Sequence, residues 1–558
     1  MVNARKQRMN RVRGEVAETY DVVVIGAGVG GLVNAALLAR AGKRVLILDQ
    51  HYVPGGNCTS FKRRNWEFDV GLHYVGDCHE GGLLPRMLEA CGATDVHFRP
   101  MSDELECLNF GDFTFNIPRS RVEFEKRLVA RYPKEKRGIR RYIRFLEQCD
   151  RAAVADQGGT RWQRLKSIVT SPLLVWYANR TAGEFIDSCT SNRELQCILT
   201  AQNGTYAVAP KRVSAVLHAG LQNHYFRSGG WYPEGGGQHL SNRLSAAIEE
   251  AGGDLRLSTQ VHEIVVEDGR AVGVTFENKR LGRRTVRADT IVSNADLKKT
   301  VLELVGREHF SAKYADKVAS YQMALPLFIV YLGLDIAPED LPYGNSNVWL
   351  LDGTDPDTDY AQLERGEMPD NPWIYISTSS LKDPDNRAIA PAGHSNLEVM
   401  TVVPRDLAFW GITPDQLRDG SYKDSLGYQA AKKRLTDACV AQAERLIPGL
   451  KGHIVLQEAA TPMTHGRYVQ STEGSCYGLS AIPSQFLQAR PGSRSPLKGL
   501  YYCGTNCRAG HGIMGSMVSG VQAADAILRN GVKRRVLGRQ SEGTVKVEGT
   551  ERRAEAAA

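Results

Sequence analysis

The sequence predicts an α/β protein with a parallel sheet to which two widely separated parts of the chain contribute. Two observations predict this fold class. A complete strand–helix–strand unit with a glycine-rich turn occupies residues 20–56, and a second strand–loop–helix unit occupies residues 500–526. The chain has 558 residues, of which 42% are hydrophobic, so it is long enough for two or three domains with sizeable cores.

The first unit reads YDVVVIGAGVGGLVNAALLARAGKRVLILDQHYVPGG from Tyr20. Residues 21–25 are apolar and β-branched, which is typical of a buried parallel strand. Gly26, Gly28 and Gly31 follow at G-x-G-x-x-G spacing, and a helix rich in Leu and Ala is predicted over residues 32–41. Residues 44–48 are a second buried strand, and it ends in Asp49, 18 residues after Gly31. This unit predicts a dinucleotide site.

Each glycine has its own expected role in that site. Gly26 permits the tight turn, Gly28 lets a pyrophosphate approach the backbone, and Gly31 lets the helix pack closely on the strand. The helix N-terminus offers free N–H groups and a positive dipole end to the phosphates. Asp49 is expected to bind the ribose hydroxyls, which argues against a 2′-phosphate. The alternative is a glycine-rich turn in an unrelated α/β fold.

The next blocks carry a family resemblance. Gly55 and Gly56 extend the fingerprint in the manner of flavoprotein oxidoreductases, and the block FDVGLHYVG follows at residues 68–76, preceded by Arg63 and Arg64. With these motifs the sequence resembles the carotenoid desaturase superfamily, in scattered blocks from about Tyr20 to Asn530. That group contains phytoene desaturases, carotenoid cis–trans isomerases and retinol saturases. The HY of FDVGLHYVG is more similar to the isomerase and saturase branch.

The resemblance implies a Rossmann-type FAD-binding domain, discontinuous and glutathione-reductase-like, with an inserted α+β substrate domain. It also places the second unit, LYYCGTNCRAGHGIMGSMVSGVQAADA, against the flavin of FAD, with a helix N-terminus near Gly515 at the N1–C2=O edge of the ring. Gly510, Gly512 and Gly515 repeat the glycine spacing, but no second strand with a terminal acid follows, so we do not predict a second dinucleotide site. The cofactor-binding residues expected in full are Gly26, Gly28, Gly31, Asp49, Gly55, Gly56, Val261 (backbone, beside the adenine), Gly504, Gly512 and Gly515.

The predicted domain order alternates between the two domains. A disordered basic arm (1–19) and a disordered tail (533–558) are expected at the ends. Between them, the FAD-binding domain is expected to consist of three segments (20–100, 229–299 and 496–532), and the substrate domain of two segments (101–228 and 300–495).

By this resemblance the expected activity is that of an FAD-dependent oxidoreductase acting on carbon–carbon bonds of a long apolar polyene or lipid by hydride exchange at flavin N5. Desaturation, saturation and cis–trans isomerisation all fit, and the substrate, the direction, the electron donor or acceptor and the oligomeric state stay open. The leading candidates for a proton carrier are His73, Tyr74 and His511. His73 and Tyr74 also fit a packing role beneath the ring. His465, Tyr468 and Tyr477 are further candidates for the same role, and Glu458 and Arg467 have weaker claims.

Two other classes of function fit parts of the pattern. One is an amine-oxidase-like flavoenzyme, which shares a two-segment flavin domain. The other is a non-catalytic lipid-binding protein of the GDP-dissociation-inhibitor type. The intact glycine motif, Asp49 and the C-terminal block argue against the second, because a protein without flavin has little need of all three.

Charge and cysteine content limit which classes of partner and which cellular compartment the sequence predicts. The net charge is +8, but residues 1–20 and 533–558 carry much of it, so no nucleic-acid face is predicted. Basic termini fit either solvated tails or weak attraction to anionic lipid. Within the apolar stretch 162–179, residues 173–177 fit a membrane surface, a substrate tunnel or a core helix. Eleven scattered cysteines indicate reduced thiols in a cytoplasmic protein with no metal site. The N-terminus lacks a secretory pattern, and no run of about 18 apolar residues predicts a membrane span.

Overall fold

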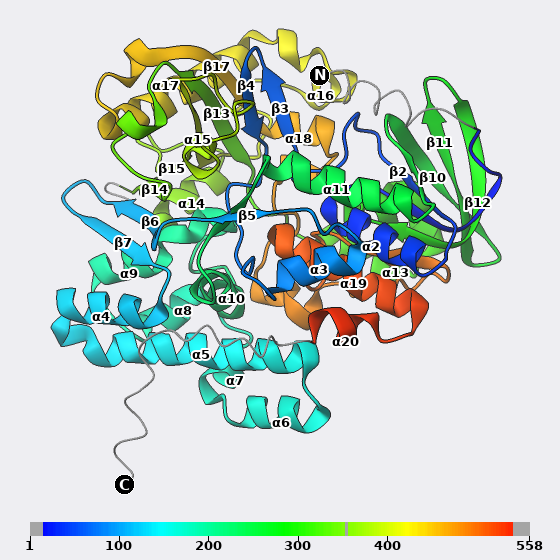
Figure 1. Ribbon diagram of the computed structural model, residues 1–558, viewed down its shortest axis with the longest axis horizontal. Helices are drawn as coiled ribbons and strands as arrows, with labels where there is room; N and C mark the ends of the chain where they lie inside the picture. The colour runs from blue at the N-terminus through cyan, green and yellow to red at the C-terminus, as the bar shows by residue number, and fades with distance from the viewer. Residues whose placement is uncertain (1–14, 352–354, 539–558) are drawn as a thin grey trace.

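The structure is a computed structural model that describes residues 15–351 and 355–538 (Figure 1). Two seven-stranded sheets form its framework. In the first sheet the strand order is β10-β11-β12-β1-β2-β9, with β18 paired to β12, and in the second it is β17-β13-β16-β15-β14-β6-β7. The two sheets lie at opposite sides of the view in Figure 1, and the helices α4 to α10 lie below the second sheet.

The first sheet brings together three distant stretches of the chain. Strand β1 lies between β2 and β12 and is parallel to both, and β12 is in turn parallel to β18. Its apolar strand residues are buried, as in sheets covered on both faces. The strands are β1 (Thr19–Ile25), β2 (Val45–Leu48), β9 (Asp254–Arg256), β10 (Thr259–Glu267), β11 (Arg270–Asn278), β12 (Gly282–Ser293) and β18 (Leu500–Tyr502).

Two helices that start at the carboxyl edge of this sheet pack closely on each other. These are α2 (Val29–Arg40) and α19 (Gly512–Leu528). Asn34 of α2 donates a hydrogen bond from Nδ2 to the carbonyl oxygen of Gly520 at 3.1 Å. A Cβ atom on Gly520 would lie 2.3 Å from the carbonyl oxygen of Gly30, so only glycine allows this approach. The helices α3 (Leu83–Cys91), α11 (Gly236–Glu250) and α20 (Val532–Leu537) complete this core.

The second sheet separates two apolar cores. Its strands are β6 (Glu104–Asn109), β7 (Thr114–Pro118), β13 (Leu327–Leu334), β14 (Asn347–Leu350), β15 (Ile374–Ser377), β16 (Ser395–Val402) and β17 (Ile454–Ala460). On one face it packs against α17 (Leu426–Leu446). On the other face it shares a core with a helical group. That group contains α4 (Arg121–Arg131), α5 (Lys136–Gly158), α6 (Arg161–Val169), α7 (Pro172–Tyr177), α8 (Ala182–Asp187), α9 (Arg193–Thr200) and α10 (Ala215–Phe226).

Short elements join these layers. Two small antiparallel pairs lie outside the two large sheets, β3 (Ser60–Arg63) with β4 (Trp66–Asp69) and β5 (Phe98–Pro100) with β8 (Trp231–Pro233). The remaining helices of four or more residues, apart from 3₁₀ and π turns, are α13 (Ala312–Ser320), α14 (Pro356–Glu364), α15 (Ser379–Lys382), α16 (Pro414–Asp419) and α18 (Pro462–Tyr468). Within residues 15–351 and 355–538, no helix is both long and apolar enough to cross a bilayer.

Most predicted elements form, and several parts of the structure differ from the sequence interpretation. The predicted tail from residue 533 is helical up to Leu537, because Val532, Val536 and Leu537 give α20 an apolar face that is buried. Val16, in the predicted arm, is buried as well. Strands β6 and β7 were not predicted, and they join the second sheet through a parallel pairing with β14. Residues 1–14 and 539–558 lie outside the described residues.

Candidate active site

One cavity of about 1040 Å³ joins the two sheets. Its lining includes the glycine turn before α2, the end of β2 and the start of α19, and also aromatic side chains of the second sheet. Typical ligand pockets measure roughly 300–1,000 Å³. The volume is therefore at the upper end of the range, enough for a cofactor together with a portion of a substrate.

The glycine turn has the backbone shape expected of it. Gly26 has a φ of 94°, in the left-handed region. A Cβ atom on Gly31 would lie 2.2 Å from the carbonyl oxygen of Gly26, so a side chain there would force α2 away from the strand. Gly55 donates its N–H to the carbonyl oxygen of Ala27 at 2.8 Å and forms a bridge with Gly28. Gly55 and Gly56 therefore lie against the turn that precedes α2.

Asp49 lies at the end of β2 and lines the cavity. Its carboxylate accepts hydrogen bonds from the backbone N–H of Ala27 at 2.6 Å and of His51 at 2.7 Å. Burial raises the pKa of Asp49, and these two hydrogen bonds oppose the rise. Val261 of β10 lines the same cavity. The carboxylate and Val261 therefore border one end of the cavity, and the predicted role of Val261 beside an adenine stays a prediction.

Asn294 is a site residue that the sequence interpretation missed. It follows β12 and donates from Nδ2 to the carbonyl oxygen of Gly26 at 3.2 Å. A Cβ atom on Gly28 would lie 2.8 Å from its Nδ2, and one on Gly504 would lie 2.5 Å from its Oδ1. Asn294 thus occupies the point where the three stretches of the first sheet meet. The available signal was its position, because polar residues directly after a parallel strand lie at the ligand edge.

The C-terminal block supplies a second helix N-terminus to the cavity. Gly504 has a φ of 89° and donates its N–H to Oγ of Ser519 at 2.7 Å. A Cβ atom on Gly515 would lie 2.3 Å from the carbonyl oxygen of Ala509, so the loop folds tightly over the start of α19. Among the described residues, no side chain caps the N-terminus of α2 or of α19.

These features fit FAD. Two helix N-termini with free N–H groups and positive dipole ends open into one cavity, beside glycines that leave the backbone accessible. A carboxylate lies at the strand end where a ribose is expected. Gly26, Gly28, Asp49, Gly55 and Gly56 would hold the nucleotide half, and Gly504, Gly512 and Gly515 would border the flavin half. The assignments of individual residues stay predictions.

His511 is the residue immediately before α19. Its Nε2 lies 3.2 Å from the carbonyl oxygen of Thr205, and its ring stacks on Tyr477 with centroids 5.3 Å apart. Burial lowers the pKa of His511 to about 4, so the ring is neutral near pH 7. Nε2 therefore carries the proton that it donates to Thr205. The buried Nδ1 has no hydrogen-bond partner among the described residues and faces its surroundings as an acceptor.

His73 and Tyr74 line the cavity on the side of the second sheet. Nδ1 of His73 lies 2.8 Å from Oε2 of Glu398, a residue of β16 with no exposed surface. The ring of Tyr74 stacks on Tyr225 with centroids 4.4 Å apart. The structure therefore brings His73, Tyr74 and His511 to one cavity, from the block after β4 and from the C-terminal block.

The other candidates divide into cavity and surface residues. His465, Tyr468 and Tyr477 line the cavity, and burial lowers the pKa of His465 to about 4. Glu458 also borders it but forms an ion pair with Arg63, and both side chains are more than two-fifths exposed. Arg467 lies over the ring of Tyr468 at 5.4 Å.

The region of the cavity beside the second sheet is aromatic and apolar. One wall comes from strands and loops of that sheet, and the other comes from the helical group. The lining residues of these two walls include Phe61, Leu174, Leu217, Leu221, Leu327, Ile329, Tyr331, Trp349, Trp373, Tyr375 and Met400. This chamber suits a long hydrocarbon better than a polar metabolite.

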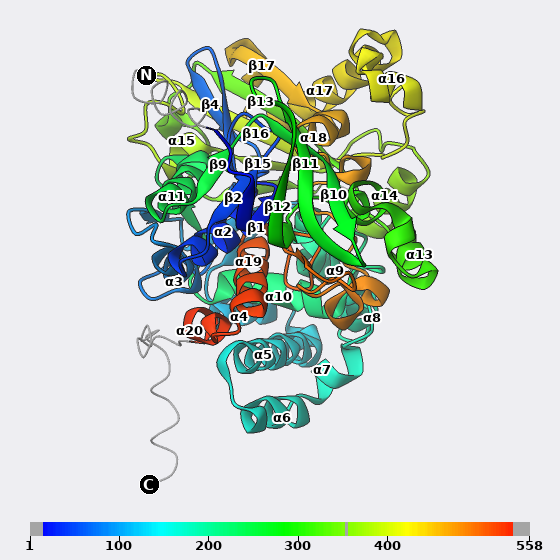
Figure 2. The ribbon, with the colours of Figure 1, turned by 90° about the vertical axis from the view of Figure 1, so that its right-hand side faces the viewer.

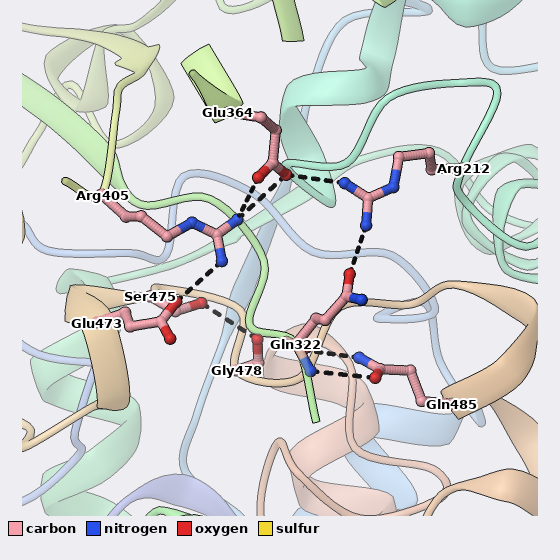
Figure 3. Close-up of polar contacts among 8 residues, drawn as sticks. All are labelled: Arg212, Gln322, Glu364, Arg405, Glu473, Ser475, Gly478 and Gln485. Atoms are coloured by element: carbon pink, nitrogen blue, oxygen red, sulfur yellow. Dashed lines mark hydrogen bonds and ion pairs between the residues drawn. The ribbon is translucent and has the colours of Figure 1, made fainter. Parts of the chain in front are cut away.

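A cluster of ion pairs holds the loop that carries Tyr477 (Figure 3). Arg405 bonds to Glu364 at 3.1 Å and to Glu473 at 2.9 Å, and Glu364 also bonds to Arg212 at 3.0 Å. Oγ of Ser475 donates to the carbonyl oxygen of Gly478 at 3.2 Å, which closes the loop around Tyr477. The cluster joins the helical group, α14 and this loop on the outside of the chamber.

Comparisons with known proteins agree with this geometry. The family model for flavin containing amine oxidoreductases matches residues 29–424. The chain is 28% identical to an all-trans-retinol 13,14-reductase of Danio rerio, over 92% of this chain and 86% of the relative. It is 27% identical to the chloroplastic prolycopene isomerase 2 of an Oncidium hybrid cultivar, over 92% of this chain and 84% of the relative. A solved oxidoreductase from Methanosarcina mazei has the same fold, with a TM-score of 0.59 at 17% identity over 91% of this chain and 99% of that one.

Proposed function

Because this chain belongs to the family of flavin-containing amine oxidoreductases, we propose that it uses FAD to desaturate, saturate or isomerise carbon–carbon bonds of a long apolar polyene. It is an FAD-dependent oxidoreductase. When bound, FAD supplies hydride transfer at its N5 atom. The chain's own residues bind the cofactor, exclude water from the chamber and position the polyene. Desaturation, saturation and cis–trans isomerisation are the three reactions that such a substrate can undergo there.

One observation carries this proposal. The aromatic chamber and the cofactor cradle, which is formed by Gly26, Gly28, Gly55, Gly56 and the start of α19, belong to a single cavity. An apolar chain in the chamber therefore has direct access to a cofactor bound in the cradle. The relatives named for all-trans-retinol and for prolycopene support the same substrate class. An amine substrate and a purely lipid-binding role are the two competing functions.

The test uses the purified protein reconstituted with FAD and a set of candidate substrates in liposomes, in one arm with dithionite as the reductant without air and in the other with air as the oxidant. We expect all-trans-retinol, prolycopene or phytoene to be converted, with the product separated by chromatography and its mass measured. A gain of two hydrogens indicates saturation, a loss of two indicates desaturation, and an unchanged mass with a new retention time indicates isomerisation. Flavin reduction by benzylamine or putrescine without any polyene conversion would favour an amine oxidase. Polyene binding without any conversion would favour a lipid carrier.

We also propose that this protein takes its substrate from the surface of an anionic lipid bilayer, through the hairpin formed by α6 and α7. Within the stretches of the chain that the structure describes, no residue of α6 is buried. Trp162 is 80% exposed and Val169 is 73% exposed, and Leu165 and Ile168 are also exposed. In Figures 1 and 2, α6 lies at the outer edge of the molecule, beyond α5 and α7.

The pattern on α6 favours a bilayer over a protein partner. At 3.6 residues per turn, its four apolar residues fall within one arc of about 120°. Arg164 and Lys166 flank this arc on its two sides, as in helices that lie in the interface of anionic membranes. Exposed tryptophans are typical of the same interface. Arg180 adds a further positive charge, with its guanidinium 4.8 Å from the ring of Trp176.

Helix α7 connects this surface to the chamber. Leu174 lines the cavity, whereas the next two residues, Val175 and Trp176, are 57% and 62% exposed. Residues of α5 line the cavity beside Leu174. An apolar molecule that leaves a bilayer at α7 would therefore reach the chamber without crossing water, which avoids the free-energy cost of exposing a long hydrocarbon.

A further inference from the structure

A cluster of buried charged side chains surrounds His73. It contains Asp69 of β4, Lys382 of α15 and Glu398 of β16, none of which is more than 3% exposed. Burying charged groups is costly unless they are paired, and such clusters often mark functional sites. This cluster is built from three separate stretches of the chain; Glu398 and Lys382 bond to His73 of the cavity wall, and Asp69 bonds to Glu398.

His73 is held at two points. Its ring nitrogen Nδ1 bonds to Oε2 of Glu398 at 2.8 Å, and its backbone carbonyl oxygen accepts a hydrogen bond from Nζ of Lys382 at 2.8 Å. Lys382 is itself fixed by Oδ1 of Asn347 at 2.6 Å and Oγ of Ser377 at 2.7 Å. The ring and the backbone of His73 are therefore both anchored by buried residues, while the side chain, 13% exposed, lines the cavity.

The two oxygens of Glu398 have separate partners. Oε1 accepts the backbone N–H of Asp69 at 3.0 Å, and Oε2 faces Nδ1 of His73. Asp69 in turn accepts from the hydroxyl of Tyr232 at 2.5 Å and from the N–H of Gly237 at 3.0 Å. Because Asp69 N–H is a donor only, it determines which oxygen of residue 398 must be an acceptor.

Charge balance supports this arrangement. Burial, and then the proximity of Glu398, raises the pKa of Asp69 well above its usual range. Burial lowers the pKa of Lys382, while Glu398, Glu106 and Asp69 raise it, so that it falls to about 8. Asp69 and Lys382 thus lie close enough to Glu398 for these groups to change each other's pKa, and Oε2 of Glu398, 2.8 Å from Nδ1 of His73, is the atom placed to accept the Nδ1–H.

We infer that Glu398 is a positioning residue that holds the proton of His73 on Nδ1, so that Nε2 is the nitrogen that exchanges a proton with a substrate in the chamber. This role rests on the proposed function. The step moves one proton and no electrons: the Nε2–H bond of the charged ring breaks as a bond from hydrogen to a substrate atom forms, and the ring takes up a proton from bulk solvent after the product has left the chamber. Glu398 acts through His73 and does not touch the substrate.

The test measures the tautomer of His73 directly. Protein labelled with ¹⁵N-histidine is studied as the holoenzyme without substrate, and the signals of His73 are assigned by their loss in His73→Asn. We expect the wild-type ring to carry its proton on Nδ1 when neutral. In Glu398→Gln, the amide oxygen stays with Asp69 N–H and the NH₂ group faces His73, so Nδ1 becomes an acceptor and the proton moves to Nε2. The matched control is Glu458→Gln on β17, a strand that β13 separates from β16, and it should leave the His73 signals unchanged.

The outcomes separate this inference from the proposed function. A wild-type ring protonated on Nε2, or the same tautomer in wild type and Glu398→Gln, would overturn it. The wild-type measurement needs only His73→Asn for the assignment, so a Glu398→Gln protein that fails to fold does not remove the test. If the wild type converts a polyene, Glu398→Gln should lower turnover about 10²- to 10⁴-fold with FAD still bound. If it converts none, the tautomer result stands on its own and the proposed function fails.

Discussion

Nδ2 of Asn294 donates a hydrogen bond to the carbonyl oxygen of Gly26 across 268 residues of sequence, at 3.2 Å. The same side chain fills the space beside Gly28, where an added Cβ atom would lie 2.8 Å from Nδ2. The first glycine turn and the loop after β12 are therefore fitted to each other as well as to a cofactor.

From this contact we expect Gly28→Val to abolish FAD binding. The branched side chain would occupy the place where a pyrophosphate approaches the backbone, and it would displace Asn294. The measurement is the ratio of flavin to protein absorbance after reconstitution with excess FAD. Gly452→Val is the control, because an added Cβ atom there meets nothing within 4 Å. Full flavin occupancy in Gly28→Val would show that the cofactor site has been placed wrongly.

His511→Ala should lower turnover by roughly ten- to ten-thousand-fold if the residue contacts the reacting groups, while FAD stays bound. Since burial lowers the pKa of His511 to about 4, the ring stays neutral from about pH 5 upward. We therefore expect the pH dependence of turnover between pH 5 and 8 to be the same in wild type and in His511→Gln. A profile midpoint that disappears with this histidine would contradict the neutral assignment.

Acid should destabilise the fold through His218. Its ring lies between the hydroxyls of Tyr142 at 2.8 Å and Tyr206 at 3.4 Å, and burial lowers its pKa from 6.5 to about 4. The unfolded chain binds the proton first, so stability is lost as the pH falls from 6.5 towards 4. Each pH unit is worth at most about 1.4 kcal/mol for this group.

His218→Gln removes that titration. Urea unfolding at pH 7.5 and at pH 5 should show a smaller loss of stability for His218→Gln than for wild type, by about 1–2 kcal/mol. The glutamine keeps a polar partner for the tyrosine hydroxyls. An equal loss of stability in both proteins would mean that His218 does not contribute to the acid sensitivity.

The α6–α7 hairpin should control binding to vesicles. Replacing both Trp162 and Trp176 with Ser should weaken sedimentation with phosphatidylglycerol-containing vesicles by at least about tenfold, because each buried aromatic side chain contributes roughly 1.5–3 kcal/mol. Binding should also weaken as salt is added, since Arg164, Lys166 and Arg180 are exposed. Leu426→Ser is the matched control, as Leu426 is 87% exposed on another helix. Equal binding of the double variant and wild type would exclude this hairpin as the docking element.

The elements that the sequence predicted are those whose signals are local. One short stretch contains the apolar strands β1 and β2, the glycine spacing from Gly26 to Gly31, and Asp49 at the strand end. Each of these signals supports the interpretation of the next one. The strands β13, β15 and β16 were predicted from short runs of apolar residues. The family resemblance added the second anchor at residues 500–526, which the glycine pattern alone would have left ambiguous.

The features that were missed depend on contacts between distant residues. Glu398 lies in an apolar strand, and only the fold shows that it faces His73. Asn294 gains its role from glycines more than 200 residues away in both directions. Strand β6 is completed by β14, whose sequence lies beyond the whole helical group. The exposure of Trp162 could not be predicted either, because a helix with the same pattern of apolar residues would bury this ring if it packed against the core.

The order of strands in the first sheet has a consequence for synthesis on the ribosome. Strand β1 emerges early, but its neighbour β12 follows only at residues 282–293 and β18 at residues 500–502. Until then β1 has an open edge, and such long-range pairing folds slowly and leaves strands exposed to aggregation. The cradle closes only when α19 has been translated, so FAD stabilises the finished chain and not the nascent one. Supply of riboflavin during expression should therefore govern the yield of folded protein after release, with little effect on how far translation proceeds.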